Sequence, residues 1–528
     1  MGKLPIGIQS FVSLREDGYM YVDKTEYIEK LLNGGKVYFL SRPRRFGKSL
    51  FLSTLKAYFE GKKELFSGLK IAEIEKEKAD PWEEYPVIHM SFATGNYTDE
   101  GELEAKVNNI LVDIAKDHGV EDIRENTNGD RLLDLLKNIK KKTGKGVVVL
   151  IDEYDKPLLD NLNFNEKQED ENRRILKGFF GALKDADEYL KFVFITGVTK
   201  FSKVSLFSDL NQLDDISLEE KYSGICGITE EELEHVFSAE ILALAERRNL
   251  SKEECISKLR RKYDGYHFSE GELSVYNPFS LLNCFAKLDF GNYWFATGTP
   301  TFLVQSLMKY GISLQDFTTG INATADDMSD YRVGSESVIP LFYQAGYLSI
   351  SGYDSEFREY TLSFPNAEVE YGFMHALLPS INASYIGKTG KFNASTITRY
   401  ILSGDVDSFC GMLKALLASI PYYEGQDPSN EQQWRNIVFA VFTILGQYVH
   451  AEVHSSNGRS DCIVETDSLI YIFEFKYNKT ADEALRQINE KGYAAAFTAS
   501  DKKIIKVGAN FSSDAGTLDE WKVEESSE

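Results

Sequence analysis

The sequence predicts an α/β protein that begins with a parallel sheet and a phosphate-binding loop, and three observations predict this class. Val37–Leu40 is a short apolar run, as expected of a buried strand. Apolar residues then recur at helical spacing between Leu50 and Phe59. Between these two runs lies Ser41-Arg-Pro-Arg-Arg-Phe-Gly-Lys-Ser49. A strand, a tight loop ending in Gly-Lys-Ser and a helix are the parts of a phosphate-binding loop.

The residue types in this loop suit a nucleotide phosphate. Backbone N–H groups at the start of a helix, together with the helix dipole, attract phosphate oxygens. Lys48 is expected to reach the β- and γ-phosphates, Ser49 to hold Mg²⁺, and Gly47 to let the backbone approach closely. The usual pattern has a glycine five positions before Gly47; this chain has Arg42 there, and a chance Gly-Lys-Ser at a helix start is the alternative. The predicted nucleotide contacts are Arg44, Arg45, Phe46, Gly47, Lys48 and Ser49.

A second apolar run ends in acidic residues. Val147–Ile151 has the pattern of a buried parallel strand, and Asp152 and Glu153 follow it. Because ligands of open α/β sheets bind beyond the carboxyl ends of the strands, Asp152 is expected to anchor Mg²⁺ and Glu153 to orient and deprotonate the attacking water. A third strand, Phe192–Thr196, leads to Thr199, and the hydroxyl of Thr196 or of Thr199 is predicted near the γ-phosphate. An acidic surface turn, and threonine as an ordinary strand residue, are the alternatives.

Near the C-terminus, two apolar runs around a polar turn predict a β-hairpin formed by Gly458–Glu465 and Ile470–Lys476. In the expected register Asp461 lies opposite Glu474, while Glu474 and Lys476 share a face of the sheet. Two carboxylates beside a lysine can hold Mg²⁺ and help to activate water or hold a scissile phosphate. One alternative is a salt bridge between Glu474 and Lys476 on an exposed strand. Another is a domain with this arrangement of residues that binds a ligand and catalyses no reaction.

Composition narrows the class of protein. The 528 residues carry a net charge of −23, from 59 Lys and Arg against 82 Asp and Glu. This balance opposes non-specific binding of a phosphate backbone, although it leaves room for a local basic groove. The longest apolar stretch is too short to span a bilayer, and the N-terminus has no export signal. The five scattered cysteines predict neither disulfides nor zinc, so we expect a cytoplasmic protein with no membrane partner.

The chain is expected to divide into four parts. The first alternates strands and helices, the pattern of a parallel sheet. In the second, capping patterns begin helices at Thr229, Ser251 and Asn277, which indicates a helical lid. The third contains a helix followed by a hairpin at about residues 347–364, the outline of a winged helix, with a packing hairpin that contacts no DNA as the alternative. The expected domains are 1–220, 221–290, 291–415 and 416–528.

Several strings, spread over most of the sequence, occur together in one known family. They are Tyr21-Val-Asp-Lys-Thr25, Arg42-Pro-Arg-Arg-Phe-Gly-Lys-Ser49, Leu150-Ile-Asp-Glu-Tyr-Asp155, Ile195-Thr-Gly-Val-Thr-Lys-Phe201, Asp209-Leu-Asn211, Tyr263-Asp-Gly-Tyr-His-Phe268 and Tyr276-Asn-Pro278. Together they resemble bacterial AAA-ATPase-like proteins that carry a C-terminal PD-(D/E)XK nuclease-like domain. The family favours arginine at the position of Arg42, so the missing glycine is a trait of the family. The resemblance implies an AAA-type core with a helical lid, followed by a PD-(D/E)XK α/β domain.

The resemblance also implies roles for residues near the C-terminus. Asp461, Glu474 and Lys476 match the Asp…Glu-x-Lys core of these nucleases. Glu431 matches an acidic residue that many of them place on a preceding helix, and Gln487 matches a glutamine near their catalytic site. The implied metal ligands are therefore Glu431, Asp461 and Glu474, and the implied catalytic residues are Asp461, Glu474, Lys476 and Gln487.

These predictions combine into an ATPase fused to a nuclease, with ATP and Mg²⁺ as cofactors. ATP binding or hydrolysis would reposition the C-terminal domain, which would cut a nucleic acid, DNA or RNA. The alternative is a signalling NTPase that works as a switch and whose C-terminal domain binds a protein partner without cutting. A third hypothesis is a nucleotide-binding scaffold with little turnover. A homo-oligomer is compatible with each of them.

Overall fold

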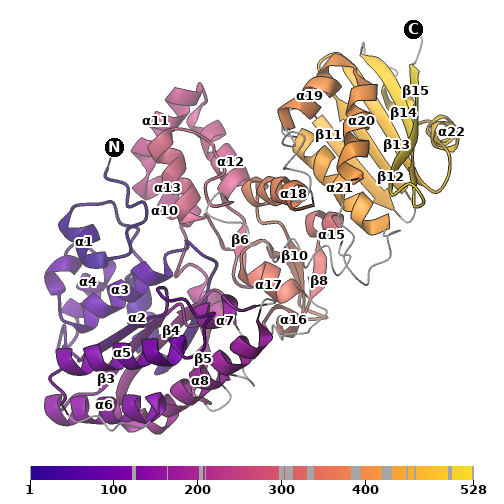
Figure 1. Cartoon of the computed structure of the whole chain (residues 1–528). Coiled ribbons are helices and arrows are strands. Elements are labelled where there is room, and N and C mark those ends of the chain that lie inside the picture. Colours follow the sequence, from indigo (N-terminus) through magenta and orange to yellow (C-terminus); the bar gives the residue numbers. More distant parts are fainter. Residues whose placement is uncertain are drawn as a thin grey trace. The chain divides into compact units, whose positions relative to one another are not determined.

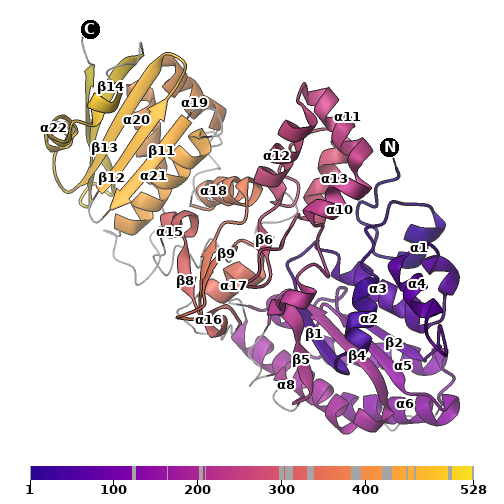
Figure 2. The same cartoon turned by 180° about the vertical axis from the view of Figure 1, so that it is seen from behind.

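The structure is a computed structural model, drawn from opposite sides in Figures 1 and 2. It forms two compact units: residues 1–297 with 321–368, and residues 298–320 with 369–528. The four-domain division stays a prediction. The described residues are 2–121, 127–162, 165–200, 206–207, 210–295, 303, 313–329, 338–381, 394–418, 431–446, 450–456, 459–497 and 502–525. The side chains at 378–381, 394–395, 431–433, 450–456, 459–461 and 495–496 lie outside this description.

The N-terminal unit is built on a five-stranded parallel sheet with the order β2-β3-β4-β1-β5 (Figure 1). Strands β1, β3 and β4 are almost wholly buried, as expected of a parallel sheet with helices on both faces. The apolar strands predicted from the sequence are thus confirmed. Strand β4 lies between β1 and β3, so the segment after β4 can reach the residues that follow both neighbours. The strands are β1 (Val37–Ser41), β2 (Val87–Ser91), β3 (Val147–Asp152), β4 (Leu190–Gly197) and β5 (Leu213–Asp215).

Helices flank this sheet. They are α1 (Phe11–Glu16), α2 (Glu26–Leu32), α3 (Lys48–Phe59), α4 (Lys70–Lys76), α5 (Glu102–Asp117), α6 (Asn128–Thr143), α7 (Lys156–Leu159) and α8 (Glu166–Asp185). Helices α5, α6 and α8 pack against one another, while α3 packs on β2 and β3. Gly47 precedes α3 with a φ of 98°, a conformation that glycine adopts without a steric penalty. The buried Phe51, Leu52 and Leu55 anchor the helix that carries Lys48 and Ser49 at its start.

A helical lid follows the sheet in sequence. Its elements are α10 (Glu230–Val236), α11 (Ser238–Arg248), α12 (Lys252–Tyr263), β6 (Tyr266–His267), β7 (Ser274–Val275) and α13 (Pro278–Lys287). Thr229 and Ser251 form capping boxes, and the Asn277 side chain caps α13, as the sequence predicted. The lid has its own apolar core, against which the N-terminal residues Leu4 and Ile6 pack.

The N-terminal unit also contains a small three-stranded antiparallel sheet with the order β8-β10-β9. Its elements are β8 (Ile321–Ala323), α16 (Ala325–Ser329), α17 (Ile339–Gln344), β9 (Ser349–Asp354) and β10 (Glu359–Ser363). The predicted helix and hairpin are confirmed. The hairpin is fixed to the lid, because the His267 backbone N–H donates to the Ser349 hydroxyl at 2.8 Å and the Asn366 amide donates to the Asp264 carbonyl at 2.7 Å.

The C-terminal unit is built on a mixed sheet with the order β11-β12-β13-β14-β15, in which β13 and β14 are parallel and the other pairs antiparallel. Its strands are β11 (His450–Ser456), β12 (Arg459–Glu465), β13 (Leu469–Tyr477), β14 (Lys503–Ser512) and β15 (Thr517–Glu525). Its helices are α15 (Leu314–Thr319), α19 (Ala394–Ser403), α20 (Val406–Leu417), α21 (Glu431–Leu445) and α22 (Ala481–Lys491), while α18 (Ala367–Ile381) begins at the boundary of the two units. Figures 1 and 2 both show α22 on one side of this sheet and α20 and α21 on the other.

The predicted hairpin register is confirmed. Strands β12 and β13 are antiparallel neighbours, and Asp461 is the register partner of Glu474. Phe473 and Phe475 pack against Phe442 of α21, on the face opposite to that of Glu474. Within the part of the chain that the structure describes, no helix is long and apolar enough to cross a membrane.

Candidate functional site

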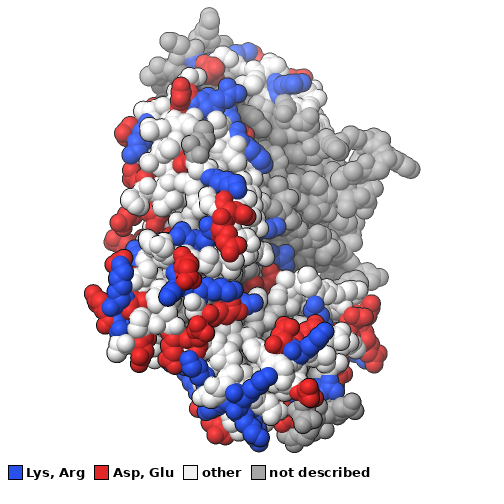
Figure 3. Space-filling view, turned by 90° about the vertical axis from the view of Figure 1, so that its left-hand side faces the viewer, with Lys and Arg blue, Asp and Glu red and all other residues white. Residues whose placement is uncertain are grey.

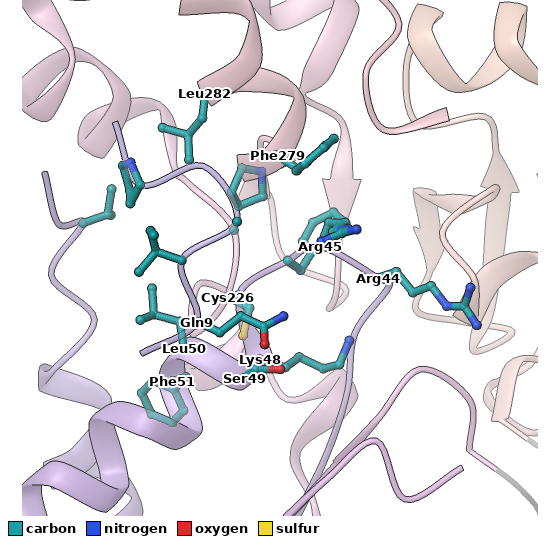
Figure 4. Close-up of a pocket in the computed structure, with 18 of the residues that line it drawn as sticks. Gln9, Arg44, Arg45, Lys48, Ser49, Leu50, Phe51, Cys226, Phe279 and Leu282 are labelled. Carbon is teal, nitrogen blue, oxygen red and sulfur yellow. The ribbon is translucent and has the colours of Figure 1, made fainter. Parts of the chain in front are cut away.

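A cavity of about 620 Å³ opens beside the phosphate loop of the N-terminal unit (Figure 4). Lys48 and Ser49 form part of its wall, and Phe279 and Leu282 of the lid helix α13 form another part. The N-terminal segment, residues 5–9, supplies a third part. A mainly apolar wall with a cationic loop at one end has the size and chemistry of a nucleotide pocket.

Lys48 is buried and points into its own loop. Its ammonium group donates to the carbonyl oxygens of Arg42 at 2.8 Å and Pro43 at 3.0 Å. Burial lowers the pKa of Lys48, and the nearby carboxylates of Asp152 and Asp155 oppose this shift. Because Lys48 also lines the cavity, its ammonium group can transfer these hydrogen bonds to a phosphate, which is the role predicted for it.

Arg42 fills the place of the usual glycine with a structural cross-link. Its side chain is 1% exposed, and its guanidinium donates to the carbonyls of Ser41 and Ser217, both at 2.8 Å, and of Tyr222 at 3.2 Å. The guanidinium also lies over the Phe268 ring, 4.0 Å from its centroid. Arg42 therefore joins the phosphate loop to the turns after β5 and to the lid. Its guanidinium contacts protein groups on all of these segments.

The next three loop residues, all predicted nucleotide contacts, differ in position. Arg44 and Arg45 are exposed; Arg45, with a φ of 69°, places its guanidinium 5.1 Å from the Phe279 ring centroid, while Arg44 extends away from that pair (Figure 4). Phe46 is buried edge-on against Tyr266, with ring centroids 4.7 Å apart. All three line the cavity, and the Phe46 side chain serves chiefly to anchor the loop on the lid.

The acidic residues after β3 form an ordered group. The Thr196 hydroxyl donates to the Asp152 carboxylate at 2.7 Å, and the same carboxylate oxygen accepts the Glu153 backbone N–H at 3.0 Å. Glu153 has a φ of 51° and lines the cavity. Asp152 and Thr199 are buried and are not among the described residues of the cavity wall. The structure thus brings Glu153 into the cavity with Lys48 and Ser49, and leaves Asp152 and Thr199 behind the wall.

Sequence reasoning missed part of the cavity wall. Pro5–Gln9 and Cys226 line it, as does Phe279 at the start of the lid helix α13. These residues come from distant parts of the chain and follow no phosphate-binding pattern. The Asn277-Pro278 helix start was the one indication that α13 begins nearby. Asp155 also lines the cavity, although the sequence singled it out only as part of a string.

In the C-terminal unit, a buried charged cluster lies on β13. Glu474 is 0% and Lys476 5% exposed, and the Lys476 ammonium donates to the carboxylate of Glu474 and to the side-chain carbonyl of Gln487 on α22. Gly508 makes this contact possible, because a Cβ at that position would stand 2.5 Å from the Ala481 carbonyl oxygen of α22. The salt bridge between Glu474 and Lys476 that the alternative predicted is present, but it is buried and does not lie on an exposed strand. The sheet interior, rather than its surface, carries these charges.

The predicted metal ligands are only partly described. Asp461 pairs with Glu474 in the backbone register, so both positions belong to one face of the sheet. The side chains of Asp461 and of Glu431, at the start of α21, lie outside the described residues. Among the described side chains, no group of three or more His, Cys, Asp or Glu is placed to hold a metal ion. The three-acid metal site therefore stays a prediction.

Comparison with known proteins agrees with this two-part organisation. The family described as "Predicted AAA-ATPase" matches residues 5–207, and the family described as "PD-(D/E)XK nuclease superfamily" matches residues 429–521. An uncharacterized protein in the vnfD 5′ region of Azotobacter chroococcum mcd 1 is 38% identical over 539 residues, which cover 99% of each chain. The chain belongs to this AAA-ATPase-like family. The phosphate-loop wall of the cavity lies in the part that matches the AAA-ATPase family, while Phe279 and Leu282 of the lid lie beyond that match. The Glu474–Lys476 cluster lies in the PD-(D/E)XK nuclease-like domain.

Two solved structures are also similar to this chain. Cdc6p from Pyrobaculum aerophilum is 14% identical and aligns with 65% of this chain and 87% of its own, with a TM-score of 0.23. The ORC1 protein of Aeropyrum pernix, solved in complex with DNA, is 11% identical and aligns with 66% of this chain and 90% of its own, with a TM-score of 0.24.

Proposed function

We propose that the protein binds and hydrolyses ATP and that its C-terminal domain cuts nucleic acid with Mg²⁺. The observation that supports the nuclease most is the contact of Lys476 with Glu474 and Gln487 inside the sheet. Burying a lysine and a glutamate is costly, and a salt bridge recovers that cost poorly compared with apolar packing. A buried charged group of this kind in a nuclease-like domain is therefore best explained by chemistry.

In the ATPase part, each predicted residue has one task. Lys48 exchanges its two carbonyl partners for the β- and γ-phosphates, while the backbone around Gly47 wraps them. Glu153 orients and deprotonates the attacking water from its place on the cavity wall. Ser49 and Asp152 would hold Mg²⁺, which would offset phosphate charge when bound. Arg44, Arg45 and Thr199 contribute further phosphate contacts.

In the nuclease part, the chain supplies carboxylates and a cation. Asp461 and Glu474, with Glu431 from α21, would hold Mg²⁺, which would supply an activated water and a positive charge at the scissile phosphate. The Lys476 ammonium would exchange its hydrogen bond to Glu474 for one to the attacking water or to the phosphate, while its hydrogen bond to Gln487 keeps the group in place. The substrate is a nucleic acid, DNA or RNA, and a protein partner or homo-oligomer is compatible with this scheme.

The compartment we propose is the cytoplasm. All five cysteines are among the described residues and are buried, and no disulfide joins any of them. This is the pattern of a protein kept in a reducing environment.

A second candidate function is a nucleotide-dependent switch whose C-terminal domain binds a partner without cutting. The observation that favours it is the anchoring of the phosphate loop. Arg42 and Phe46 tie the loop to the lid, and the Trp294 indole N–H donates to the Arg44 carbonyl at 3.0 Å. A nucleotide that moves this loop would move the lid with it, which is what a switch requires.

One assay separates these functions. The purified protein is incubated with Mg²⁺, ATP and supercoiled plasmid, single-stranded DNA or RNA, while released phosphate and cut strands are followed. We expect both products, loss of phosphate release and of ATP binding in Lys48→Ala, and loss of cutting alone in Glu474→Gln. Lys56→Ala, which removes a half-buried lysine further along α3 that pairs with Glu60, is the matched control. Phosphate release without cutting of any of the three nucleic acids favours the switch, and the absence of both products contradicts the proposal.

A further inference from the structure

Asp155 makes an unusual contact at the edge of the cavity. Its side chain is 1% exposed, and one carboxylate oxygen, Oδ2, accepts the backbone N–H groups of two successive residues, Val198 at 2.9 Å and Thr199 at 2.6 Å. Both residues belong to the segment that leaves β4, next to the phosphate loop. A carboxylate that accepts two backbone N–H groups fixes that backbone more firmly than a single bond would.

Three other hydrogen bonds join the same two segments. The Tyr154 N–H donates to the Thr196 carbonyl at 3.2 Å, and the Tyr154 hydroxyl donates to the Thr199 carbonyl at 2.8 Å. The Thr196 hydroxyl donates to Asp152. Together with the two bonds of Asp155, these contacts close a seam between the ends of β3 and β4.

Gly197 lets this seam close. A Cβ at Gly197 would stand 2.6 Å from a Tyr154 ring carbon and 2.7 Å from Asp155 Oδ1. Both distances are shorter than real side chains tolerate, so a residue larger than glycine would separate the ends of β3 and β4. Glycine at this position is thus explained by the approach of Asp155.

The seam holds the residue expected to activate water. Glu153 lies between Asp152 and Tyr154, both of which are fixed to β4, and it adopts a left-handed φ of 51° that side chains seldom accept. Such a conformation persists only where the surrounding structure imposes it. Glu153 and Val198 both line the cavity. The hydrogen bonds between the ends of β3 and β4 therefore fix the position of Glu153 in the cavity wall.

We propose that Asp155 is a positioning residue for ATP hydrolysis. By holding Val198 and Thr199, it keeps the end of β4 against the end of β3 and Glu153 in its place beside Lys48. This inference rests on the proposed ATPase function. The positioning role differs from a purely structural one in what a variant should lose. If Asp155 positions Glu153, loss of its two hydrogen bonds lowers the rate of ATP hydrolysis and leaves nucleotide affinity unchanged.

Two variants at this position test the inference. Asp155→Ala removes both acceptors, whereas the amide oxygen of Asp155→Asn can still accept both N–H groups. Asp155→Ala should lower kcat by about 100-fold, the effect of misplacing a reacting group by about 1 Å, with nucleotide affinity unchanged. Asp155→Asn should keep most of kcat. Asp187→Ala is the matched control, because it removes an exposed carboxylate just before the first residue of β4, far along the strand from Val198. This variant should behave like the unaltered protein.

Hydrogen exchange of the Val198 and Thr199 amides provides a second measurement that does not need turnover. Their exchange should accelerate in Asp155→Ala and stay slow in Asp155→Asn and in the control. Unchanged kcat or unchanged exchange in Asp155→Ala would overturn the proposal, and so would a parallel loss of kcat, nucleotide affinity and thermal stability. If the unaltered protein released no phosphate, the proposed ATPase function would fail. Fast exchange confined to Asp155→Ala would then show that Asp155 orders Val198 and Thr199 but has no role in hydrolysis.

Discussion

At the scale of single residues, the phosphate loop and the acidic group facing it use buried charges in different ways. Arg42 donates to three backbone carbonyls and is not among the described residues that line the cavity, whereas Lys48 is held by two carbonyls of its own loop and lines the cavity. The first arrangement favours one fixed structure, and the second leaves a cation ready for a ligand. A sequence pattern that scores only the missing glycine cannot make this distinction.

Arg42→Gly should therefore weaken the protein even though it restores the common loop pattern. The change removes a buried charged group from three carbonyls, and we expect the free energy of unfolding of the N-terminal unit to fall by about 3 kcal/mol. Arg44→Ala, the matched control at an exposed neighbour, should change it by less than about 0.5 kcal/mol. Chemical denaturation measures both. An Arg42→Gly protein of unchanged stability with faster ATP hydrolysis would contradict the structural role.

The carboxyl group of Asp155 should also leave a mark on the pH dependence of stability. Burial raises the pKa of Asp155 to about 6, while the two backbone N–H groups and Lys48 act against this rise. In the unfolded chain an aspartate titrates near about 3.9. Because the folded state holds the proton more tightly, the contribution of Asp155 to stability is largest in acid and falls as the pH rises from about 4 to about 6.

Asp155→Asn removes this titration, so its stability relative to the unaltered protein should rise across the same pH window and stay level above it. The change should reach at most about 3 kcal/mol. Urea denaturation of both proteins without nucleotide, at several pH values between 4 and 7.5, measures the difference, in which the other titrating groups cancel. A difference that is constant over this pH range would show that Asp155 ionises as readily in the folded state as in the unfolded one.

At the scale of elements, the two candidate sites depend on close approaches between backbones. Gly197 lets β4 reach the end of β3, and Gly508 lets α22 lie on β14 close enough for Gln487 to contact Lys476. In both places a glycine decides which side chains meet, although it carries no chemistry of its own.

Gly508→Ala should separate Gln487 from Lys476. The new methyl group would lie 2.5 Å from the Ala481 carbonyl oxygen and 2.8 Å from the Leu485 backbone nitrogen, so α22 must move outward. We expect loss of most nucleic-acid cutting with ATP hydrolysis unchanged. Gly411→Ala in α20, where a Cβ meets nothing within 4 Å, is the matched control and should keep cutting intact. Full cutting activity in Gly508→Ala would show that Gln487 is not needed to position Lys476.

Local sequence patterns predict some parts of the fold and of the candidate sites, and miss others. The strands beside the phosphate loop and the pairing of Asp461 with Glu474 follow from local patterns, since strand periodicity and turn position set the register. The contacts of Asp155 with Val198 and Thr199 depend on how β3 and β4 come together, and no local pattern contains that information. The cavity wall at Pro5–Gln9 was missed for the same reason.

At the scale of the whole molecule, charge limits how nucleic acid can bind. The chain carries a net charge of −23, and the face drawn in Figure 3 intermixes Lys and Arg with Asp and Glu. Broad electrostatic attraction to a phosphate backbone is therefore weak, and the proposed binding of nucleic acid would rely on local contacts and on Mg²⁺. The proposed nuclease would gain selectivity if its access to substrate depended on a second event, and the proposed ATP turnover in the same chain could supply that event.

The most direct test of this account measures cutting of nucleic acid as a function of ATP in two ATPase variants. Glu153→Gln should bind ATP without hydrolysing it and hold the protein in its ATP-bound state, whereas Lys48→Ala should hold it in the nucleotide-free state. We predict that the Mg²⁺-dependent cutting rate depends on ATP in the unaltered protein. With ATP present, Glu153→Gln should cut at the rate of the ATP-bound protein and Lys48→Ala at the rate of the nucleotide-free protein. ATP should no longer change the cutting rate of Lys48→Ala. Equal cutting rates in all three proteins, with and without ATP, would contradict the coupling of the two sites.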